Sequence, residues 1–470
     1  MMFATDVRII ECQPYFTTEQ PRARFKFSNA VAGVITFCHV RVRVENRRGE
    51  VADGWGAILL SYPWAFREPA VDDATKDRVM RRMVEAFAKR LREYREYGHP
   101  IDIFMTLQPE VDVLAADVCA ELNLPVTLPP LAAQNCVAPV DAALHDAFGK
   151  VNGISTYDGY GREHMRHDLG SYLGPAYRDR TIADILPLSL RPRVPVFHVV
   201  GGLDALTPGD VPVVAEPSAL PQSLAAWIAQ DGVYFFKIKL NGRDHDWDFD
   251  RVKSVYTVAR QALARQRREP VLALDLNEGC ENPDYAVDLL RRMKAEQPAA
   301  FDAVLFVEQP TARDLLAEGF DMRPLAALRP LLLDEGLARL EDLDVGLTFG
   351  WTGPVLKTCK SQTVSLLLAT KAEAEAIPYA LQDLTNPGIA LVQSVGLAAR
   401  LNPLGGVEAN ARQFYPDASR PESAVHTGLI SPQAGTASTR SIRGPGLGYR
   451  VEQIPRMIFH PDGGESKSLF

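Results

Sequence analysis

From residue 194 onward, short apolar runs alternate with longer segments in which apolar residues recur at helical spacing. The runs are VPVFHVVG, FFKIKL, VLALDLN, AVLFVEQP, PLLLDE, GPVLKTC, AIPYALQD and GGVEAN. The segments between them include 248–268, 284–296, 364–375 and 387–401, each with an apolar stripe. Alternating strands and helices indicate a parallel sheet. Eight such units predict an α/β fold, a (β/α)8-type (TIM-like) barrel.

An open, doubly wound sheet is the alternative architecture for this pattern. A dinucleotide-binding sheet of that kind carries a G-x-G-x-x-G turn after its first strand, and none is present here. Gly444, Gly446 and Gly448 lie in a C-terminal segment without helical context. The barrel is therefore the preferred interpretation.

The first 190 residues show a different pattern. Residues 34–60 alternate polar and apolar positions on both sides of the turn RRGEVADG, which predicts a β-hairpin. Apolar residues at helical spacing predict helices, over 72–98, 111–122 and 140–148. The aperiodic stretch that follows, 152–174, is expected to be a loop, with His164 and His167 solvated rather than bound to a ligand.

The chain has 470 residues, too many for one ordinary domain. We expect an α+β domain at 1–190, the barrel at 191–410, and a tail at 411–470 that packs back on the first domain. A net charge of -8 argues against nucleic-acid binding, and no apolar run is long enough to span a membrane. Six scattered cysteines without a C-x-x-C pair, and an N-terminus without a signal-peptide pattern, predict a cytoplasmic protein. We also expect it to be a homo-oligomer.

Two lysines interrupt the apolar run FFKIKL. In a strand, Lys237 and Lys239 project from one face, because successive side chains point to opposite sides. A half-exposed edge strand with two solvated lysines is the simplest explanation for this pair taken alone. The strands that follow favour a functional explanation for these two lysines.

Each of the next three strands ends in a carboxylate. These are Asp275 in VLALDLN, Glu308 in AVLFVEQP, and Asp334 or Glu335 in LLLDEG, and the next strand ends with Lys357 in PVLKTC. Because the carboxyl ends of parallel strands meet at the edge where such sheets bind ligands, these side chains are expected to form one site.

Strand alternation indicates which side chains point inward. Asp275 and Asn277 share a face with the smaller residues Val271 and Ala273, so they are expected inside the barrel. Of Asp334 and Glu335, only one can point in. Lys357 points in, so Lys360 is expected to face another way or to lie beyond the end of the strand.

The ordered set of residues resembles the enolase superfamily, in particular the mandelate racemase and muconate lactonizing enzyme family and its muconate-lactonizing subgroup. Lys237 and Lys239 look like its K-x-K motif, and GPGLGYR at 444–450 is similar to its C-terminal segment. Asp275, Glu308 and Asp334 match its three magnesium ligands, and Lys357 matches its sixth-strand lysine. The resemblance is strongest over 194–410. The chain departs from the pattern after Lys360, where LKTCKSQT lacks the usual glycine pair.

This resemblance implies that the N-terminal α+β domain is a capping domain, with two loops that close over the active site. By position these are 14–31 and 61–65, the second of which contains Trp64. The resemblance also selects Asp334 as the inward residue, and Glu335 is then expected to brace a neighbouring lysine. Glu408 resembles the family's final-strand carboxylate. The candidate substrate-binding residues are therefore Trp64, Asn277, Glu335, Asp383 and Glu408.

Three carboxylates leave about half of an octahedral Mg²⁺ shell open for substrate oxygens. Mn²⁺ is a possible substitute. Zinc would favour His or Cys ligands, and neither residue type joins this set. The alternative without a metal is three acids that are only salt-bridged to lysines.

Removal of a proton next to a carboxylate builds a second negative charge, which a divalent cation offsets. We assign Lys239 as the base on one face of a small carboxylate substrate. Lys237 is its cationic neighbour, which lowers the pKa of the base, and Lys357 is the acid or base on the opposite face. Two bases predict a racemase or epimerase acting on an amino-acid derivative or dipeptide. One base with a leaving group predicts elimination or cycloisomerisation.

Two alternatives remain from the sequence. An acid-sugar dehydratase-like lyase is disfavoured, because no histidine falls on the seventh strand, AIPYALQD. A non-catalytic member of the family would keep the barrel and bind a metal or ligand.

Overall fold

The computed structural model describes residues 3–21, 25–27, 30–32, 34–212 and 220–460. Its N-terminal part holds an antiparallel sheet in the order β1-β4-β5, with bounds Val7–Glu19, Ile35–Asn46 and Val51–Leu59. A separate ribbon joins β2 (Phe25–Phe27) and β3 (Ala30–Ala32). The helices of this part are α1 (Tyr62–Ala65), α2 (Asp73–Glu93), α3 (Pro100–Leu107), α4 (Val111–Glu121) and α5 (Pro130–Val151). The predicted hairpin is confirmed as β4 and β5.

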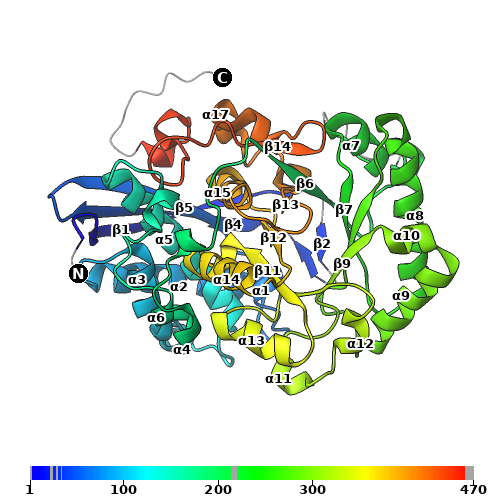
Figure 1. Ribbon diagram of the computed structural model, residues 1–470, viewed down its shortest axis with the longest axis horizontal. Coiled ribbons are helices and arrows are strands. Elements are labelled where there is room, and N and C mark those ends of the chain that lie inside the picture. Colours follow the sequence, from blue (N-terminus) through cyan, green and yellow to red (C-terminus); the bar gives the residue numbers. More distant parts are fainter. Residues whose placement is uncertain (1–2, 22–24, 28–29, 33, 213–219, 461–470) are drawn as a thin grey trace.

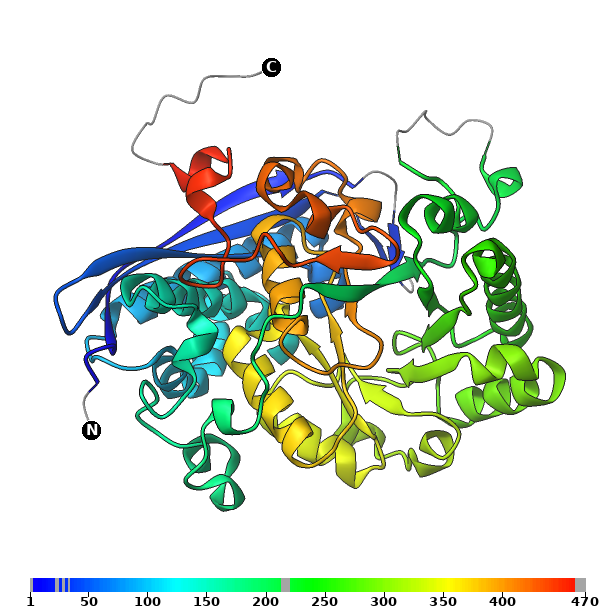
Figure 2. The same ribbon diagram turned by 45° about the horizontal axis from the view of Figure 1, so that its top comes forward.

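Eight parallel strands form a closed barrel beside this domain (Figure 1). They are β6 (Arg193–Val200), β7 (Phe235–Lys239), β8 (Val271–Asp275), β9 (Val304–Glu308), β10 (Leu331–Leu333), β11 (Gly353–Lys357), β12 (Ala380–Gln382) and β13 (Val407–Glu408). Pairing of β13 with β6 closes the sheet. On the other edge of β6, β14 (Thr436–Ser438) adds an antiparallel strand (Figure 2). The barrel predicted from the alternating pattern is confirmed.

Helices cover the outside of the barrel. The longer ones are α7 (Leu224–Asp231), α8 (His245–Leu263), α9 (Asp284–Glu296), α13 (Leu340–Thr348), α14 (Gln362–Ala374) and α15 (Gly388–Ala398). Short helices of four or five residues lie between these or after them: α10 (Pro298–Asp302), α11 (Leu315–Glu318), α12 (Arg323–Ala326) and α16 (Ala411–Phe414). The longer α17 (Arg420–Ile430) follows α16. All four predicted barrel helices are present, with ends that differ by at most a few residues.

Helix α5 is longer than predicted. The sequence predicted a helix over 140–148, but α5 continues through Pro139. Almost every residue of α5 is buried, because the helix lies between the N-terminal sheet and the barrel, so it lacks the polar face that reveals a surface helix. Gly54 and Gly56 of β5 permit its close approach, since a Cβ atom at either position would clash with the α5 backbone.

The predicted loop at 152–174 is confirmed, with only the short helix α6 (Gly170–Leu173) and a single 3-10 turn in it. Its beginning contacts the C-terminal segment: Thr156 N donates to Gly446 O at 2.9 Å, and Leu447 N donates to Asp146 Oδ1 of α5 at 2.8 Å. The GPGLG segment therefore fastens the end of the chain to α5.

A layer of apolar side chains fills the barrel interior. It consists of Phe197, Phe235, Ala273, Phe306, Leu332, Val355 and Ala380. Each of the last six stands two residues before a polar residue at the carboxyl end of its strand. Because alternate residues share a face, those polar residues point inward directly above this layer.

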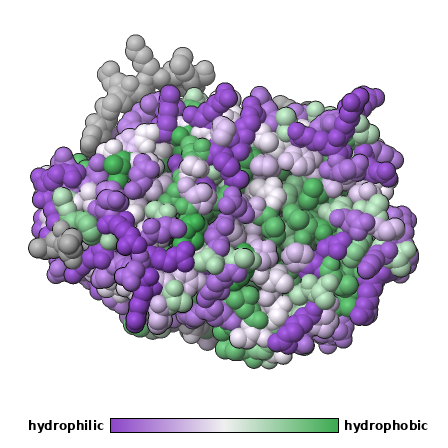
Figure 3. Space-filling model, viewed as in Figure 1, coloured by the Kyte–Doolittle hydropathy of each residue, from purple (hydrophilic) through white to green (hydrophobic). Residues whose placement is uncertain are grey.

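Hydrophilic residues cover most of the face seen in Figure 3, with apolar residues gathered mainly near its middle. None of the helices in the described ranges combines the length and the apolar character needed to cross a lipid bilayer.

Candidate active site

Three buried carboxylates stand at the carboxyl ends of adjacent barrel strands. Asp275 ends β8, Glu308 ends β9, and Asp334 directly follows β10. None is more than 1% exposed. The predicted inward orientation of Asp275 and Asp334 is confirmed by their contacts with lysines.

Lys237 forms the centre of one charged cluster. Its Nζ lies 3.0 Å from Asp275 Oδ2, 2.8 Å from Glu308 Oε1 and 3.2 Å from Glu408 Oε2. Lys239 Nζ contacts the same Asp275 oxygen, at 2.5 Å. Because the two ammonium groups share one carboxylate oxygen, they are close neighbours, as the K-x-K interpretation expects.

Gln382, at the end of β12, completes this cluster. Its Oε1 accepts a hydrogen bond from Lys237 Nζ at 2.8 Å, and its Nε2 donates to Glu308 Oε2 at 2.6 Å. The sequence analysis did not include this residue. Strand parity could have found it, because Gln382 is two residues after Ala380 of the interior layer.

A second cluster surrounds Asp334. Lys357 Nζ lies 2.6 Å from Asp334 Oδ2, and Lys360 Nζ lies 2.9 Å from Asp334 Oδ1. Lys360 lies beyond the end of β11, in a 3-10 turn at Thr358–Lys360, which is one of the two positions predicted for it. Its side chain nevertheless turns back into the site. Trp64 packs against both lysines, with its ring centroid 4.8 Å from Lys357 Nζ and 5.8 Å from Lys360 Nζ.

The residues that replace the expected glycine pair point away from the cavity. Gln362 contacts Tyr157 and Gln393. Thr363 Oγ1 donates to Asp141 Oδ1 of α5 at 2.8 Å. These two side chains therefore pack against the N-terminal domain and α15, and neither lines the cavity.

Asn277 and Glu335 form a pair beside the carboxylates. Asn277 N donates to Asp275 Oδ1 at 2.9 Å, and its Nδ2 donates to Glu335 Oε1 at 3.1 Å. The expectation that Glu335 braces a lysine is wrong, because Asp334 takes the inward position with the lysines and Glu335 turns to Asn277 instead.

Asp383 and Glu408 occupy the opposite part of the site. Asp383 is fully buried, and its Oδ1 accepts from Thr385 N at 2.8 Å. Glu408 Oε1 accepts from Asn410 Nδ2 at 3.0 Å, while its other oxygen contacts Lys237. Asn410 is a further site residue that the sequence analysis did not name.

An ion cluster at the rim, formed by Arg67, Glu278 and Arg313, fixes the segment that contains Trp64. Glu278 Oε2 lies 2.7 Å from both Arg67 Nη1 and Arg313 Nη2. Arg313 Nη2 also donates to Trp64 O at 3.1 Å. The segment 61–65, which was expected to close over the active site and which contains helix α1, thus lies against the site. Of the other expected segment, 14–31, residues 22–24 and 28–29 fall outside the described residues.

His164 and His167 take no part in the site. His164 Nδ1 lies 3.3 Å from Thr5 Oγ1, and His167 Nδ1 lies 3.1 Å from Asp102 Oδ1. Both contacts are within the N-terminal domain, so neither histidine is a ligand of the barrel site.

The contacts above set the pKa values of the buried groups. Burial disfavours charge on Asp275 and Asp334, yet the neighbouring lysines outweigh burial and hold the pKa of each well below its usual range. Burial and then the charge of Asp275 raise the pKa of Glu308 to about 8. Burial also opposes charge on Lys237 and Lys357, but the surrounding carboxylates raise the pKa of both. Lys237 therefore remains a cation beside Lys239.

The oxygen-only donor set suits a hard divalent cation such as Mg²⁺. The raised pKa of Glu308 indicates that the charge of Lys237 does not offset burial and the nearby charge of Asp275, while Gln382 adds only a neutral hydrogen bond. Within the described ranges, no three His, Cys, Asp or Glu side chains converge into a finished metal-binding group, and ammonium groups stand between the carboxylates instead. The three carboxylates therefore have the chemistry that suits Mg²⁺. The lysine ammonium groups lie between these carboxylates, in positions that a bound cation would also occupy.

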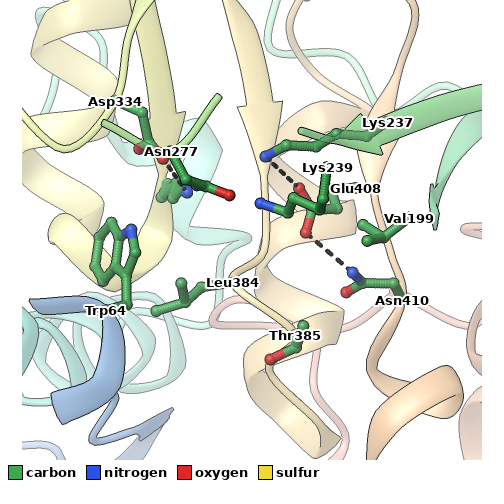
Figure 4. A pocket seen from close by; sticks show the side chains of 11 residues that line it. Trp64, Val199, Lys237, Lys239, Asn277, Asp334, Leu384, Thr385, Glu408 and Asn410 are labelled. Atoms are coloured by element: carbon green, nitrogen blue, oxygen red, sulfur yellow. Dashed lines mark hydrogen bonds and ion pairs between the residues drawn. The ribbon is translucent and has the colours of Figure 1, made fainter. Parts of the chain in front are cut away.

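The clusters enclose a cavity of about 330 Å³, including its mouth. Its lining comprises Trp64, Val199, Lys237, Lys239, Asn277, Asp334, Lys357, Leu384, Thr385, Glu408 and Asn410 (Figure 4). A small polar substrate fits such a lining.

Comparisons with known proteins agree with this arrangement. Similar solved structures include muconate lactonizing enzyme from Pseudomonas fluorescens, with a TM-score of 0.60 at 17% identity over 94% of this chain and 96% of that one. L-Ala-D/L-Glu epimerase from Bacillus subtilis has a TM-score of 0.59 at 17% identity, over 94% and 98%. N-succinyl Arg/Lys racemase from Bacillus cereus has a TM-score of 0.56 at 16% identity, over 94% and 95%. These likenesses establish the fold.

No curated protein sequence matches the chain. A sequence profile described as enolase C-terminal domain-like matches residues 219–454, just over half of the chain. The matched part contains every lysine and carboxylate of the two clusters. The chain therefore belongs to the enolase C-terminal domain-like family, within the group of mandelate racemases and muconate lactonizing enzymes.

Proposed function

We propose that this protein is a Mg²⁺-dependent enzyme that removes the proton α to the carboxylate of a small acid, of the amino-acid derivative or dipeptide class. The reaction is racemisation or epimerisation, or else cycloisomerisation. Family membership supports the reaction type, and the arrangement of the lysines supports the two-base form.

The main support for this proposal is that two lysines stand on opposite sides of the barrel. Lys239 ends β7 and Lys357 ends β11, and four strand positions separate them in a closed sheet of eight parallel strands. In Figure 4, Lys239 and Asp334, which is the partner of Lys357, lie on opposite sides of the cavity. A substrate bound between the lysines would present one face to each.

Lys239 is the base on one face, and Lys357 exchanges a proton with the other face. Lys237 stays protonated between three carboxylates and supplies a fixed positive charge beside Lys239. Gln382 restrains Lys237 and Glu308 together. Trp64 covers Lys357 and excludes water from that end of the cavity.

Asp275, Glu308 and Asp334 would hold Mg²⁺. When bound, the ion supplies positive charge to the substrate carboxylate and to the acidic side chains that otherwise keep the lysines protonated. A solved dipeptide epimerase from Enterococcus faecalis with a similar fold was complexed with Mg and a dipeptide, which supports this choice of cation.

The experiment that tests the proposal is deuterium exchange. The protein is incubated in D₂O with Mg²⁺ and a panel of dipeptides, N-acyl amino acids and hydroxy acids, and incorporation at the α carbon is read by mass spectrometry. We expect exchange with at least one compound, and its loss from one enantiomer of that compound in Lys239→Ala. Lys253→Ala is the matched control, because Lys253 is exposed on α8.

Binding without exchange of any compound would support a non-catalytic member of the family instead. Release of water without exchange into recovered substrate would support an acid-sugar dehydratase-like lyase. Among the described residues that line the cavity none is a histidine, which disfavours that second alternative.

A further inference from the structure

One glutamine connects the ends of the three strands that carry the candidate metal ligands. Gln309 directly follows Glu308 at the end of β9 and is fully buried. Its backbone N donates to Leu332 O of β10 at 3.1 Å. Its backbone O accepts from Glu278 N, in the segment that follows β8, at 2.8 Å. The position of Gln309 is therefore fixed relative to the ends of both neighbouring strands.

The side chain of Gln309 makes a second connection to the end of β10. Its Oε1 accepts hydrogen bonds from Asp334 N at 2.9 Å and from Gly336 N at 3.1 Å. Its Nε2 donates to Thr311 O at 3.0 Å, which fixes the orientation of the amide, because a carbonyl oxygen can only accept. Asp334 is itself a candidate ligand. The amide therefore holds the backbone of Asp334 beside the backbone of Glu308.

The backbone of Gln309 is strained. Its φ is 33°, a value that residues with a side chain rarely adopt, and Pro310 follows it. Such a conformation persists only where the surrounding structure holds it, and the hydrogen bonds of the Gln309 backbone and amide do so here. Strain of this kind gathers at functional sites, so its presence next to Glu308 indicates that the placement of these strand ends matters to the site.

The spacing of carboxylates at a metal site determines which cation they suit. Mg²⁺ requires near-ideal octahedral geometry with oxygens at about 2.0–2.1 Å, whereas Ca²⁺ accepts a flexible shell at about 2.3–2.6 Å. Strand ends that are held at a fixed spacing can impose the stricter geometry. Strand ends that are free to spread would suit the larger ion.

We propose that Gln309 is a positioning residue that makes the site selective for Mg²⁺ over Ca²⁺, by fixing the spacing between Glu308 and Asp334. The inference rests on the metal site of the proposed function and names a residue that tunes it from outside the cavity. Gln309 itself does not line the cavity, and its Oε1 already accepts two hydrogen bonds. It therefore acts through the two carboxylates that it positions.

Calorimetric titration of the whole protein with Mg²⁺, and separately with Ca²⁺, tests the inference. Gln309→Met keeps the length of the side chain and removes the acceptor. We expect this change to lower Mg²⁺ affinity about 10- to 100-fold and Ca²⁺ affinity by about threefold at most. The ratio of the two affinities decides the test, because partial unfolding would reduce the binding of both ions equally.

Two further variants accompany Gln309→Met. Gln309→Glu keeps oxygens that can accept from Asp334 N and Gly336 N, so it should stay within about threefold of the wild-type ratio. Gln393→Met is the matched control. Gln393 is also a buried glutamine, but its Nε2 donates to Gln362 Oε1, away from the cavity, so this change should leave the ratio unaltered.

Equal losses for the two ions in Gln309→Met would show that Gln309 supports only the fold, and unchanged Mg²⁺ affinity would show that the strand ends keep their spacing without it. An equal shift of the ratio in Gln393→Met would also overturn the inference. If Gln309→Met does not fold, Gln309→Asn, whose amide ends one carbon short, should shift the ratio in the same direction; an unchanged ratio there refutes the inference.

The wild-type protein separates this inference from the proposed function. Equal affinity for the two ions leaves no selectivity for Gln309 to set, and the inference fails, although α-proton exchange in the presence of Mg²⁺ would keep the proposed function. Binding of neither ion, with no exchange, means that the proposed function fails as well.

Discussion

Replacement of Asp141 by alanine should destabilise the protein strongly, although Asp141 is outside the cavity. This fully buried carboxylate of α5 accepts hydrogen bonds from Ser361 Oγ at 2.7 Å, Thr363 N at 2.8 Å and Thr363 Oγ1 at 2.8 Å. His145 Nε2 lies 2.8 Å from Thr363 Oγ1. Ser361 has a φ of 93°, which is unfavourable for a residue with a side chain, so these contacts hold the turn after Lys360 in a strained form.

The size of the effect follows from the donors that lose their acceptor. Each buried donor left without a partner costs about 1–3 kcal/mol, and local relaxation recovers part of that. For three donors, Asp141→Ala should lower the free energy of unfolding by roughly 3–6 kcal/mol, out of a typical total of about 5–15 kcal/mol. Asp141→Asn keeps one acceptor oxygen, and its loss should be roughly half as large.

Equilibrium urea unfolding, followed by circular dichroism, gives the shift of the midpoint. The matched control is Asp288→Ala on α9, where an exposed carboxylate lies 3.7 Å from Arg291; that change should stay within about 0.5 kcal/mol. A second readout is the reactivity of Lys360 toward an acylating reagent, which should rise in Asp141→Ala. Coinciding midpoints for the two alanine variants would refute the reasoning.

Three further predictions concern charge. Glu308→Gln should weaken Mg²⁺ binding at least tenfold in calorimetry, because the change removes one of three anionic ligands; unchanged affinity would remove Glu308 from the metal site. In a two-base enzyme, Lys239→Ala should slow exchange of one enantiomer and Lys357→Ala that of the other, each by about 10²- to 10⁴-fold. Equal loss for both enantiomers in one variant would indicate a one-base reaction instead. Burial lowers the pKa of His99 and of His198 to about 3, from an ordinary value near 6.5. The unfolded chain therefore binds more protons at these two histidines between these values, so their contribution to stability should be complete above pH 6.5 and fall as the pH drops toward 3. The raised pKa of Glu308 acts in the opposite direction, so the test uses Glu308→Gln, in which a urea midpoint constant from pH 7.5 to 4.5 would contradict this.

The strand-borne part of the site could be predicted from the sequence because two simple rules act there. Side chains alternate along a strand, and the carboxyl ends of parallel strands meet at one edge. Those rules located Lys237, Asp275 and Lys357 without knowledge of their partners. Gln382 obeys the same rules. It was missed because an uncharged side chain at the end of a three-residue strand does not stand out from the sequence as a buried charge does.

Residues beyond the strands could not be predicted in this way. Lys360 lies in a 3-10 turn, where strand alternation no longer applies, and its contact with Asp334 depends on how that turn folds back. Helix α5 has no polar face, because both sides are buried, so periodicity identified only part of it. Tertiary contacts determine both features, and local sequence patterns do not record such contacts.

The position of α5 limits how the barrel and the N-terminal domain could be separated or recombined with other domains. Gln134 Nε2 donates to Lys360 O at 2.9 Å, and Asn135 Nδ2 donates to Cys359 O at 3.5 Å. Together with Asp141, these side chains from one domain satisfy the backbone of a turn that belongs to the other. The barrel is therefore not a self-sufficient module. A chimera that joined it to a different N-terminal domain would need to transplant this face of α5 as well, or lose the turn that carries Lys360.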